Sequence, residues 1–328
     1  MVRQALVIGG SGFIGMHTLR ALQRDGRYSR VISLDISEPV EQLDGVEYRI
    51  HDCRQPIPAE LADPDTEIYN LPALRTFPGH PDAEYFETNY GTTERIIELA
   101  EAAGVRTIIF TSTMSVYATG DEPKTEDSPI DPGNAYGASK VKGEALHRQW
   151  LAGAPDRRLV ICRPAVIFGY RDNGNFTRLA NALRSRYFVF VGRSDTIKSA
   201  GYVTDLADTF LFALDRMTET GAREILYNFA YPERLTIRRI VDAFCLVGGY
   251  PRVRLVLPPW LLNAAALPFE ALNAIGIKNP IHRKRLKKLY ESTNIVPRWL
   301  EENGFPFRTD IVSALEEWKA ESPDARFV

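Results

Sequence analysis

The chain has 328 residues, of which 45% are hydrophobic and 25% are charged. These proportions are typical of a folded globular protein, and the length predicts about two domains, so fibrous, low-complexity and disordered classes are excluded. Forty basic and 42 acidic residues give a net charge of −2. A nucleic-acid-binding protein usually carries more positive charge, so we expect no nucleic-acid partner.

The three cysteines are far apart in the sequence and form no CxxC motif. We therefore expect neither a disulfide framework nor a zinc site, and the dispersed histidines predict no other metal. The N-terminus lacks a long apolar segment with a cleavage site, and prolines and polar residues interrupt the apolar stretch 257–277. Neither a signal peptide nor a transmembrane helix is expected, and the cytoplasm fits these features.

The first half of the chain alternates short strands rich in Val and Ile with helices. We expect strands at Ala5–Ile8, Val31–Leu34, Val46–Ile50, Glu67–Leu71, Thr107–Thr111 and Leu159–Arg163. We expect helices at Ile14–Arg24 and Asn89–Ala103, each ending near a glycine. Most of the strands are apolar at consecutive positions, as in strands buried on both faces. The alternation predicts an α/β protein with a doubly wound parallel sheet.

The alternation weakens after about residue 169. Strands are expected at Tyr187–Val191 and Ile225–Phe229, and helices at Leu235–Val247 and Thr309–Ala320. We predict a sheet domain from residues 1–170, rejoined by about 201–230. A smaller lobe from 171–200 and 231–328 would cover the carboxyl edge of the sheet, where α/β proteins bind ligands.

A glycine motif, GGSGFIG, spans residues 9–15 between the first expected strand and the first expected helix. Gly9, Gly12 and Gly15 allow a tight turn whose N–H groups face a pyrophosphate, with Phe13 and Ile14 in the first helical turn. Asp35 follows 20 residues after Gly15, at the end of the second strand. This combination predicts a dinucleotide-binding site of the Rossmann type.

Asp35 also indicates which dinucleotide binds. Its carboxylate can accept both adenosine ribose hydroxyls and would repel a 2′-phosphate, and no arginine follows it in Ile36-Ser37-Glu38. We therefore predict NAD, although a turn aspartate is the plainer alternative. Asp52 and Cys53, just past the third strand, are further cofactor candidates, and Asp52 could equally be a loop acid.

Tyr136 and Lys140 are four residues apart and therefore share one face of a helix. A tyrosine is a poor base at neutral pH, and a nearby ammonium lowers its pKa. The hydroxyl-rich segment TSTMSVY at residues 111–117 follows a strand, so Thr113 or Ser115 could share a substrate hydroxyl with Tyr136. An ordinary polar turn is the alternative.

Taken together, the sequence resembles the extended short-chain dehydrogenase/reductase superfamily, and in particular its nucleotide-sugar epimerases. The resemblance covers about residues 4–230. It is carried by GGSGFIG at 9–15, Asp35, NYGTT at 89–93, TSTMSVY at 111–117, YGASK at 136–140, Arg163-Pro164 and YVTD at 202–205.

The resemblance implies a role for each matching residue. Tyr136 is the acid/base, Thr113 is its hydroxyl partner and Lys140 holds the nicotinamide ribose. The cofactor-contacting set further includes Leu71, Pro72, Ala73, Asn89 and Arg163. Lys198 would bind the diphosphate of a nucleotide sugar, and Asn175 or Asn181 is a looser substrate candidate. In the basic run at 282–288, apart from the resemblance, Arg283 or Arg285 is a further candidate contact for the substrate diphosphate. A homodimer built on two helices, 89–103 and 136–152, is also implied.

The resemblance leaves the reaction open in part. Dehydratases of the superfamily carry acidic residues at the positions of Met114 and Ser115, which this chain lacks, so hydride chemistry at a carbinol is favoured. We expect NAD-dependent epimerisation of a nucleotide-diphosphate sugar, at C4. A dehydrogenase or reductase acting on a nucleotide sugar or hydroxysteroid is the alternative, and a non-catalytic NAD-sensing regulator is a third.

The stretch 257–288 pairs an apolar segment with a basic run, HRKRLKK, at 282–288. Such a pair could bind the protein peripherally to an anionic membrane surface. A packed helix followed by a solvated helix is the plainer interpretation.

Overall fold

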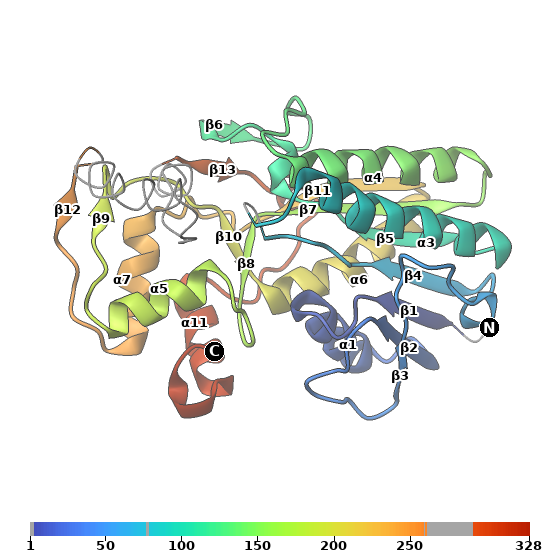
Figure 1. The fold of residues 1–328 in the computed structure, drawn as a ribbon, viewed down its shortest axis with the longest axis horizontal. Helices are drawn as coiled ribbons and strands as arrows, with labels where there is room; N and C mark the ends of the chain where they lie inside the picture. Colours follow the sequence, from blue (N-terminus) through green and yellow to red (C-terminus); the bar gives the residue numbers. More distant parts are fainter. Residues whose placement is uncertain (1–2, 77–78, 259, 261–290) are drawn as a thin grey trace, which may run out of the picture.

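The computed structural model describes residues 3–76, 79–258, 260 and 291–328. Its centre is a seven-stranded parallel sheet with the order β11-β7-β5-β4-β1-β2-β3 (Figure 1). The strands are β1 (Gln4–Ile8), β2 (Arg30–Asp35), β3 (Val46–Ile50), β4 (Thr66–Asn70), β5 (Thr107–Thr111), β7 (Arg158–Pro164) and β11 (Glu224–Phe229). The predicted doubly wound α/β fold is confirmed, and its strand order reverses beside β1, where such sheets bind ligands.

Alternate residues of β1 face opposite layers of helices. Ala5 and Val7 belong to one hydrophobic cluster, and Leu6 and Ile8 belong to the other. The first cluster includes residues of α1 and α6, and the second includes residues of α3 and α4 (Figure 1). This two-sided burial explains why the strands are apolar at consecutive positions. The helices are α1 (Phe13–Asp25), α3 (Gly91–Ala102), α4 (Ala135–Ala152) and α6 (Val203–Thr220).

The helix expected at Asn89–Ala103 begins earlier than the sequence predicts. A helical segment starts at α2 (Asp82–Tyr85), continues through the π-helical turn η2 (Phe86–Tyr90) and runs into α3. Pro81 precedes its first turn, a position that suits proline because the first helical N–H groups have no partner inside the helix. The π turn re-phases the helix just before α3, a local change that hydrophobic periodicity does not reveal.

A second lobe has a hydrophobic cluster of its own, which includes Phe176, Phe190, Phe244 and Trp318. Its elements are α5 (Asn175–Arg184), β9 (Phe190–Val191), α7 (Ile237–Gly248), β12 (Val256–Leu257) and α11 (Ile311–Glu321). The two predicted helices of this region are thus confirmed, with starts set by Thr236 and Asp310, whose side chains accept N–H groups of the first turn.

The strand expected at Tyr187–Val191 is shorter than predicted. Only Phe190 and Val191 pair, with β12, because the residues before them are still leaving α5 through backbone turns. Two further small strand pairs were not predicted, because their partners lie far apart in the sequence. The remaining elements are η1 (Ala59–Leu61), η3 (Met114–Val116), β6 (Gly120–Lys124), β8 (Val166–Phe168), β10 (Ala200–Tyr202), β13 (Thr293–Ile295), α10 (Arg298–Glu302) and η4 (Pro323–Ala325).

Among the described residues, no helix is both long enough and apolar enough to cross a membrane. Most of the apolar-then-basic stretch 257–288 and the predicted substrate residue Arg283 lie outside the described residues.

Candidate active site

The glycine-rich connection between β1 and α1 packs against the loop that follows β4. Gly9 has a φ of 83°, which side chains rarely adopt, and an added Cβ would lie 3.0 Å from the nitrogen of Pro72. α1 begins after Gly12, which supplies no capping side chain. The N–H groups of the first turn are therefore free to face an anion. This loop and turn contain the predicted cofactor residues Gly9, Gly12, Phe13, Ile14 and Gly15.

Asp35 ends β2 beside this loop. One carboxylate oxygen accepts the N–H of Ser11 at 3.0 Å, and the other accepts the N–H of Ser37 at 3.0 Å. The two hydrogen bonds fix the carboxylate next to the glycine motif.

Lys140 projects from α4 into the protein and is only 1% exposed. Its Nζ donates to the carbonyl oxygens of Thr111 at 2.9 Å and Pro72 at 3.2 Å, and lies 4.8 Å from the ring centre of Phe110. Burial lowers the pKa of Lys140 to about 7, although the charge of Glu144 opposes this shift. The ammonium thus joins the ends of β4 and β5 to α4.

Tyr136 and Thr113 meet where α4 begins. The Thr113 hydroxyl lies close enough to Tyr136 to affect its pKa, and it accepts the N–H of Ser115 at 3.1 Å. α4 approaches this turn so closely that a Cβ on Gly137 would lie 2.1 Å from the carbonyl oxygen of Ser115. Burial raises the pKa of Tyr136, whereas the Thr113 hydroxyl and the charge of Arg75 lower it.

Arg75 is a site residue that sequence reasoning missed. It is exposed in the loop after β4, and its Nη2 donates to Oδ1 of Asn173 at 2.7 Å. The charge of Arg75 lowers the pKa of Tyr136 and so opposes the effect of burial. The ammonium of Lys140 is held by backbone carbonyls, and its expected effect on the pKa of Tyr136 stays a prediction. An exposed loop arginine carries no sequence pattern that could have revealed this role.

Asn89 is 3% exposed and braces the loop after β4. Its side chain accepts the N–H of Leu74 at 2.7 Å and donates to the Leu74 carbonyl at 3.3 Å and to the Ser139 hydroxyl at 3.0 Å. Ser139 in turn donates to the carbonyl oxygen of Tyr136 at 2.8 Å. The structure thus places Asn89 between the predicted cofactor loop, with Leu71, Pro72 and Ala73, and the helix that carries Tyr136.

Arg163, another predicted cofactor residue, is directed toward protein partners. Its guanidinium donates to both carboxylate oxygens of Glu144, at 2.8 and 2.6 Å, and to the Tyr117 hydroxyl at 2.8 Å. The side chains of Arg163 and Glu144 are both 3% exposed. Ser112 donates to the same carboxylate at 2.6 Å. Arg163 therefore holds the Glu144 carboxylate, whose charge acts on Lys140 one helical turn away.

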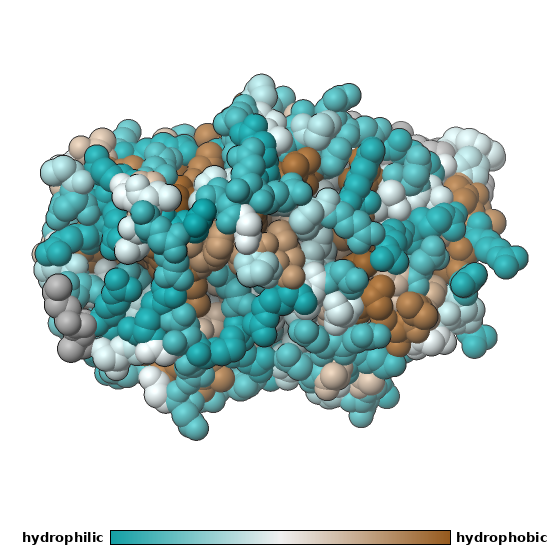
Figure 2. Space-filling view, turned by 180° about the vertical axis from the view of Figure 1, so that it is seen from behind, coloured by the Kyte–Doolittle hydropathy of each residue, from teal (hydrophilic) through white to brown (hydrophobic). Residues whose placement is uncertain are grey.

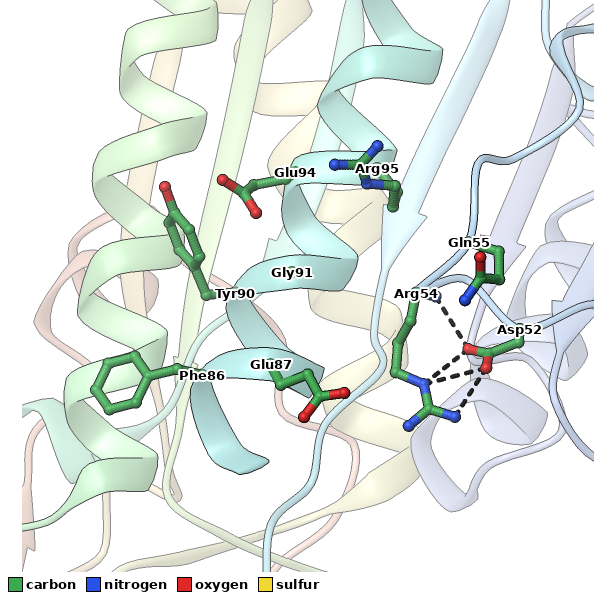
Figure 3. A pocket seen from close by; sticks show the side chains of 9 residues that line it. All are labelled: Asp52, Arg54, Gln55, Phe86, Glu87, Tyr90, Gly91, Glu94 and Arg95. Atoms are coloured by element: carbon green, nitrogen blue, oxygen red, sulfur yellow. Dashed lines mark hydrogen bonds and ion pairs between the residues drawn. The ribbon is translucent and has the colours of Figure 1, made fainter. Parts of the chain in front are cut away.

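Asp52 lies at an open hollow of about 650 Å³ between the β3–β4 connection and the start of the helix that includes η2 and α3 (Figure 3). In this view the Asp52 carboxylate is turned toward Arg54, with which it forms an ion pair of 2.8 Å. Cys53 is buried beside it, and burial raises the pKa of its thiol to about 12. Asp52 therefore already has a cationic partner, and Cys53 is a neutral apolar group.

The predicted substrate residues are not gathered in one place. Ser115 lies beside Thr113, and Asn175 is exposed in the first turn of α5, directly after the loop that contacts Arg75. Lys198 is half-buried, and its Nζ donates to the carbonyl oxygen of Glu291 at 2.6 Å. Within the part of the chain that the structure describes, no group of three or more His, Cys, Asp or Glu side chains could hold a metal ion.

Comparison with known proteins identifies the family. The sequence model of the NAD dependent epimerase/dehydratase family matches residues 5–229. The chain belongs to this family, and it is an NAD-dependent enzyme of the extended short-chain dehydrogenase/reductase type. The predictions of the family, of catalysis and of NAD as the cofactor are confirmed.

Individual relatives show the breadth of the family. The chain is 29% identical to N-acetyl-alpha-D-glucosaminyl-diphospho-ditrans,octacis-undecaprenol 4-epimerase of Escherichia coli O157:H7, over 92% of this chain and 89% of that protein. It is 28% identical to UDP-glucose 4-epimerase of Azospirillum brasilense, over 75% and 78%. Its fold resembles that of UDP-glucose 4-epimerase of Thermus thermophilus in complex with NAD, with a TM-score of 0.73, 18% identity and coverage of 97% and 100%.

The residues on the sheet edge fit NAD. Besides the free first turn of α1 and the anchored Asp35, the hydroxyl of Thr111 is buried and has no hydrogen-bond partner among the described residues. Thr111 also supplies a carbonyl to Lys140, so an unsatisfied donor and a buried ammonium lie together. Such groups are expected where a bound ligand completes the hydrogen bonding.

Proposed function

We propose that the protein interconverts C4 epimers of a sugar linked to a diphosphate, with NAD as the resident cofactor. The observation that carries this proposal is the contact of Thr113 with Tyr136 at the carboxyl edge of the sheet, one helical turn from the buried Lys140. This arrangement supports proton transfer at a sugar hydroxyl. No added carboxylic acid of the kind used for elimination is present at Met114 or Ser115.

In this proposal the glycine motif binds the pyrophosphate, Asp35 binds the adenosine ribose and Lys140 binds the nicotinamide ribose. NAD, when bound by these residues, would supply reversible hydride transfer at the substrate carbon. The Tyr136 phenolate takes the proton of the C4 hydroxyl, directly or through the Thr113 hydroxyl, as C4 loses its hydrogen. Tyr136 would return the proton to the C4 oxygen of the 4-keto sugar once the sugar has turned over and C4 has regained a hydride on its opposite face.

We assign Ser115, Asn175, Lys198 and Arg283 to the substrate, with Lys198 on the diphosphate. We also propose the division into a sheet domain, residues 1–170 and about 201–230, and a substrate lobe, 171–200 and 231–328. The relatives support a 4-epimerase, and they include both nucleotide-linked and lipid-linked substrates by name. A cytoplasmic location and a homodimer through α3 and α4 belong to the same proposal.

Substrate turnover tests this function. The purified protein is incubated with UDP-glucose, UDP-N-acetylglucosamine and a polyprenyl-diphosphate sugar, while epimers and NADH are both measured. We expect an epimer to form with no net NADH. Tyr136→Phe should reduce the rate by roughly 10²–10⁴-fold, while NAD affinity stays nearly unchanged, because only the proton acceptor is lost. Tyr48→Phe, in the edge strand β3, is the matched control.

The alternative function gives a different result in the same assay. A dehydrogenase or reductase would release a keto product and change the NADH concentration in proportion to it. A non-catalytic NAD sensor would give neither product, and its Tyr136→Phe variant would behave as the wild type.

A further inference from the structure

The end of the second lobe farthest from the seven-stranded sheet carries exposed arginines together with exposed apolar side chains. We call this surface the arginine–aromatic face, and it consists of Arg186, Tyr187, Arg252, Arg254, Leu255 and Trp260. Tyr187 and Trp260 are each 67% exposed, and Leu255 is 56% exposed. Large apolar side chains with this exposure are uncommon when they cluster, and such clusters mark interaction sites.

Strand pairing brings the two segments of this face together. β9 and β12 pair with Phe190 opposite Val256, and the N–H of Phe190 donates to the carbonyl oxygen of Leu255 at 3.0 Å. The segments before each strand, with Arg186 and Arg254, therefore run side by side. Figure 1 shows β9 and β12 at the left end of the molecule, and in Figure 2 brown and teal atoms are interspersed at the corresponding right end.

The charge of this face has one sign. Residues 184–192 and 250–260 contain four arginines and no acidic residue. Across the described part of the chain, Arg186, Arg252 and Arg254 form no ion pair, although most arginines of the sheet domain do. Unpaired guanidinium groups beside an exposed tyrosine and tryptophan match an anionic lipid surface, because aromatic rings favour the interface and arginines its negative headgroups.

We propose that the arginine–aromatic face docks the protein on an anionic lipid bilayer, where the active site receives a diphosphate sugar that is attached to a membrane lipid. The proposal rests on the proposed function in one respect, namely that the substrate carries a diphosphate. It adds that the diphosphate is joined to a lipid and that the protein reaches it at the bilayer surface.

α5 connects this face to the active site. Its first residue, Asn175, follows the loop in which Asn173 accepts a hydrogen bond from Arg75. Its last residue, Arg184, lies just before Arg186 and Tyr187 of the docking face. A helix of 10 residues is about 15 Å long. The docking face and the loop that contacts Arg75 are therefore the two ends of one short rigid element, so a sugar diphosphate anchored in the bilayer need not leave it completely.

Vesicle sedimentation tests the docking. The full-length protein is mixed with vesicles of equal parts phosphatidylglycerol and phosphatidylcholine, and with vesicles of phosphatidylcholine alone. We expect binding to the anionic vesicles that weakens with added salt. Arg252→Gln/Arg254→Gln should weaken the partition by about 25-fold, since each arginine near an anionic surface contributes about five-fold. Arg3→Gln/Arg49→Gln removes the same charge from exposed positions of the sheet domain and should bind as the wild type.

Activity measurements separate docking from catalysis. The arginine variant should retain wild-type epimerisation of a water-soluble nucleotide sugar and lose activity toward a lipid-linked diphosphate sugar in the anionic vesicles. Absence of vesicle binding by the wild type, or equal binding by the two double variants, overturns the docking whatever the activity. Vesicle binding without epimerisation of any sugar leaves docking in place and overturns the proposed function. A change in oligomer mass in the arginine variant would instead make this face an interface between copies of the chain.

Discussion

The carboxylate of Glu144 lies between two buried cations. It is one helical turn beyond Lys140 on α4, and both of its oxygens accept hydrogen bonds from Arg163, which β7 supplies from beside the helix. The hydrogen bonds and charge of Arg163 outweigh burial and lower the pKa of Glu144. One carboxylate therefore neutralises Arg163 and also favours the charged form of Lys140.

Removing this carboxylate should change the titration of Lys140. In Glu144→Gln, the pKa of Lys140 should fall below its value of about 7, because burial then acts without an opposing charge. In the pH profiles of kcat/KM and of NAD affinity, the alkaline limb should move to lower pH, because the Lys140 ammonium loses its proton at a lower pH. The variant should also be less stable by about 3 kcal/mol, because Arg163 stays buried without a charged partner.

The double variant Glu144→Gln/Arg163→Met separates the two effects. It should regain much of the stability in urea unfolding, because the buried charge of Arg163 is removed together with its partner, while the shifted alkaline limb remains. An alkaline limb at the wild-type pH in both variants would show that Glu144 acts on stability alone.

Arg75 should determine the pH at which the acidic limb of the kcat/KM profile falls. Arg75→Gln removes the charge that lowers the pKa of Tyr136, so a higher pH is needed to form the phenolate and the acidic limb of kcat/KM should move upward. Arg75→Lys should keep the limb near its wild-type position. Because the side chain is exposed, stability should change by less than about 0.5 kcal/mol. Superimposable pH profiles for Arg75→Gln and the wild type would contradict this role.

His147 should make the protein less stable in acid. It is fully buried, with Nδ1 donating to the Gly143 carbonyl at 2.7 Å and Nε2 accepting from Asn70 at 3.3 Å. Burial lowers its pKa from 6.5 to about 4. Between these values the unfolded chain binds a proton that the folded protein excludes, so the free energy of unfolding falls as the pH drops through this range.

His147→Gln can form similar hydrogen bonds but does not titrate. The loss of stability between pH 7 and pH 4 should therefore shrink by roughly 3 kcal/mol in this variant, as measured by urea unfolding at several pH values. The exposed His80→Gln is the control and should follow the wild-type curve. Identical pH dependence in all three proteins would mean that His147 does not drive the effect.

Asp35 should select NAD over NADP. Asp35→Asn can still accept the N–H of Ser11 but no longer repels a 2′-phosphate. The dissociation constant for NADP divided by that for NAD should therefore fall by about ten-fold or more. Calorimetric titration with each dinucleotide measures the ratio. Asp52→Asn provides a matched control, because Asp52 is paired with Arg54 in the hollow of Figure 3 and should not affect the choice. An unchanged ratio in Asp35→Asn would show that Asp35 does not contact the adenosine ribose.

The sequence predicts the strands of the large sheet well, because burial on both faces leaves an unbroken apolar run in each, as in β1 and β5. It also predicts Tyr136 and Lys140, since their spacing is local to one helix. The pairing of Glu144 with Arg163 was not predicted, because it depends on how α4 packs beside β7. The link from Arg75 to Asn173 joins two loops from distant parts of the sequence, and no periodicity encodes such a contact.

The position of β11 at the edge of the sheet determines when the sheet can be completed during synthesis. β7 pairs with β5 on one side, but its other side is covered only by β11, which is made after α5 and α6. Until then the emerging chain exposes an apolar, unpaired edge strand, the kind of surface that aggregates. Truncation before residue 224 should therefore give an insoluble product, even though the glycine motif, Tyr136 and Lys140 would all be present in it.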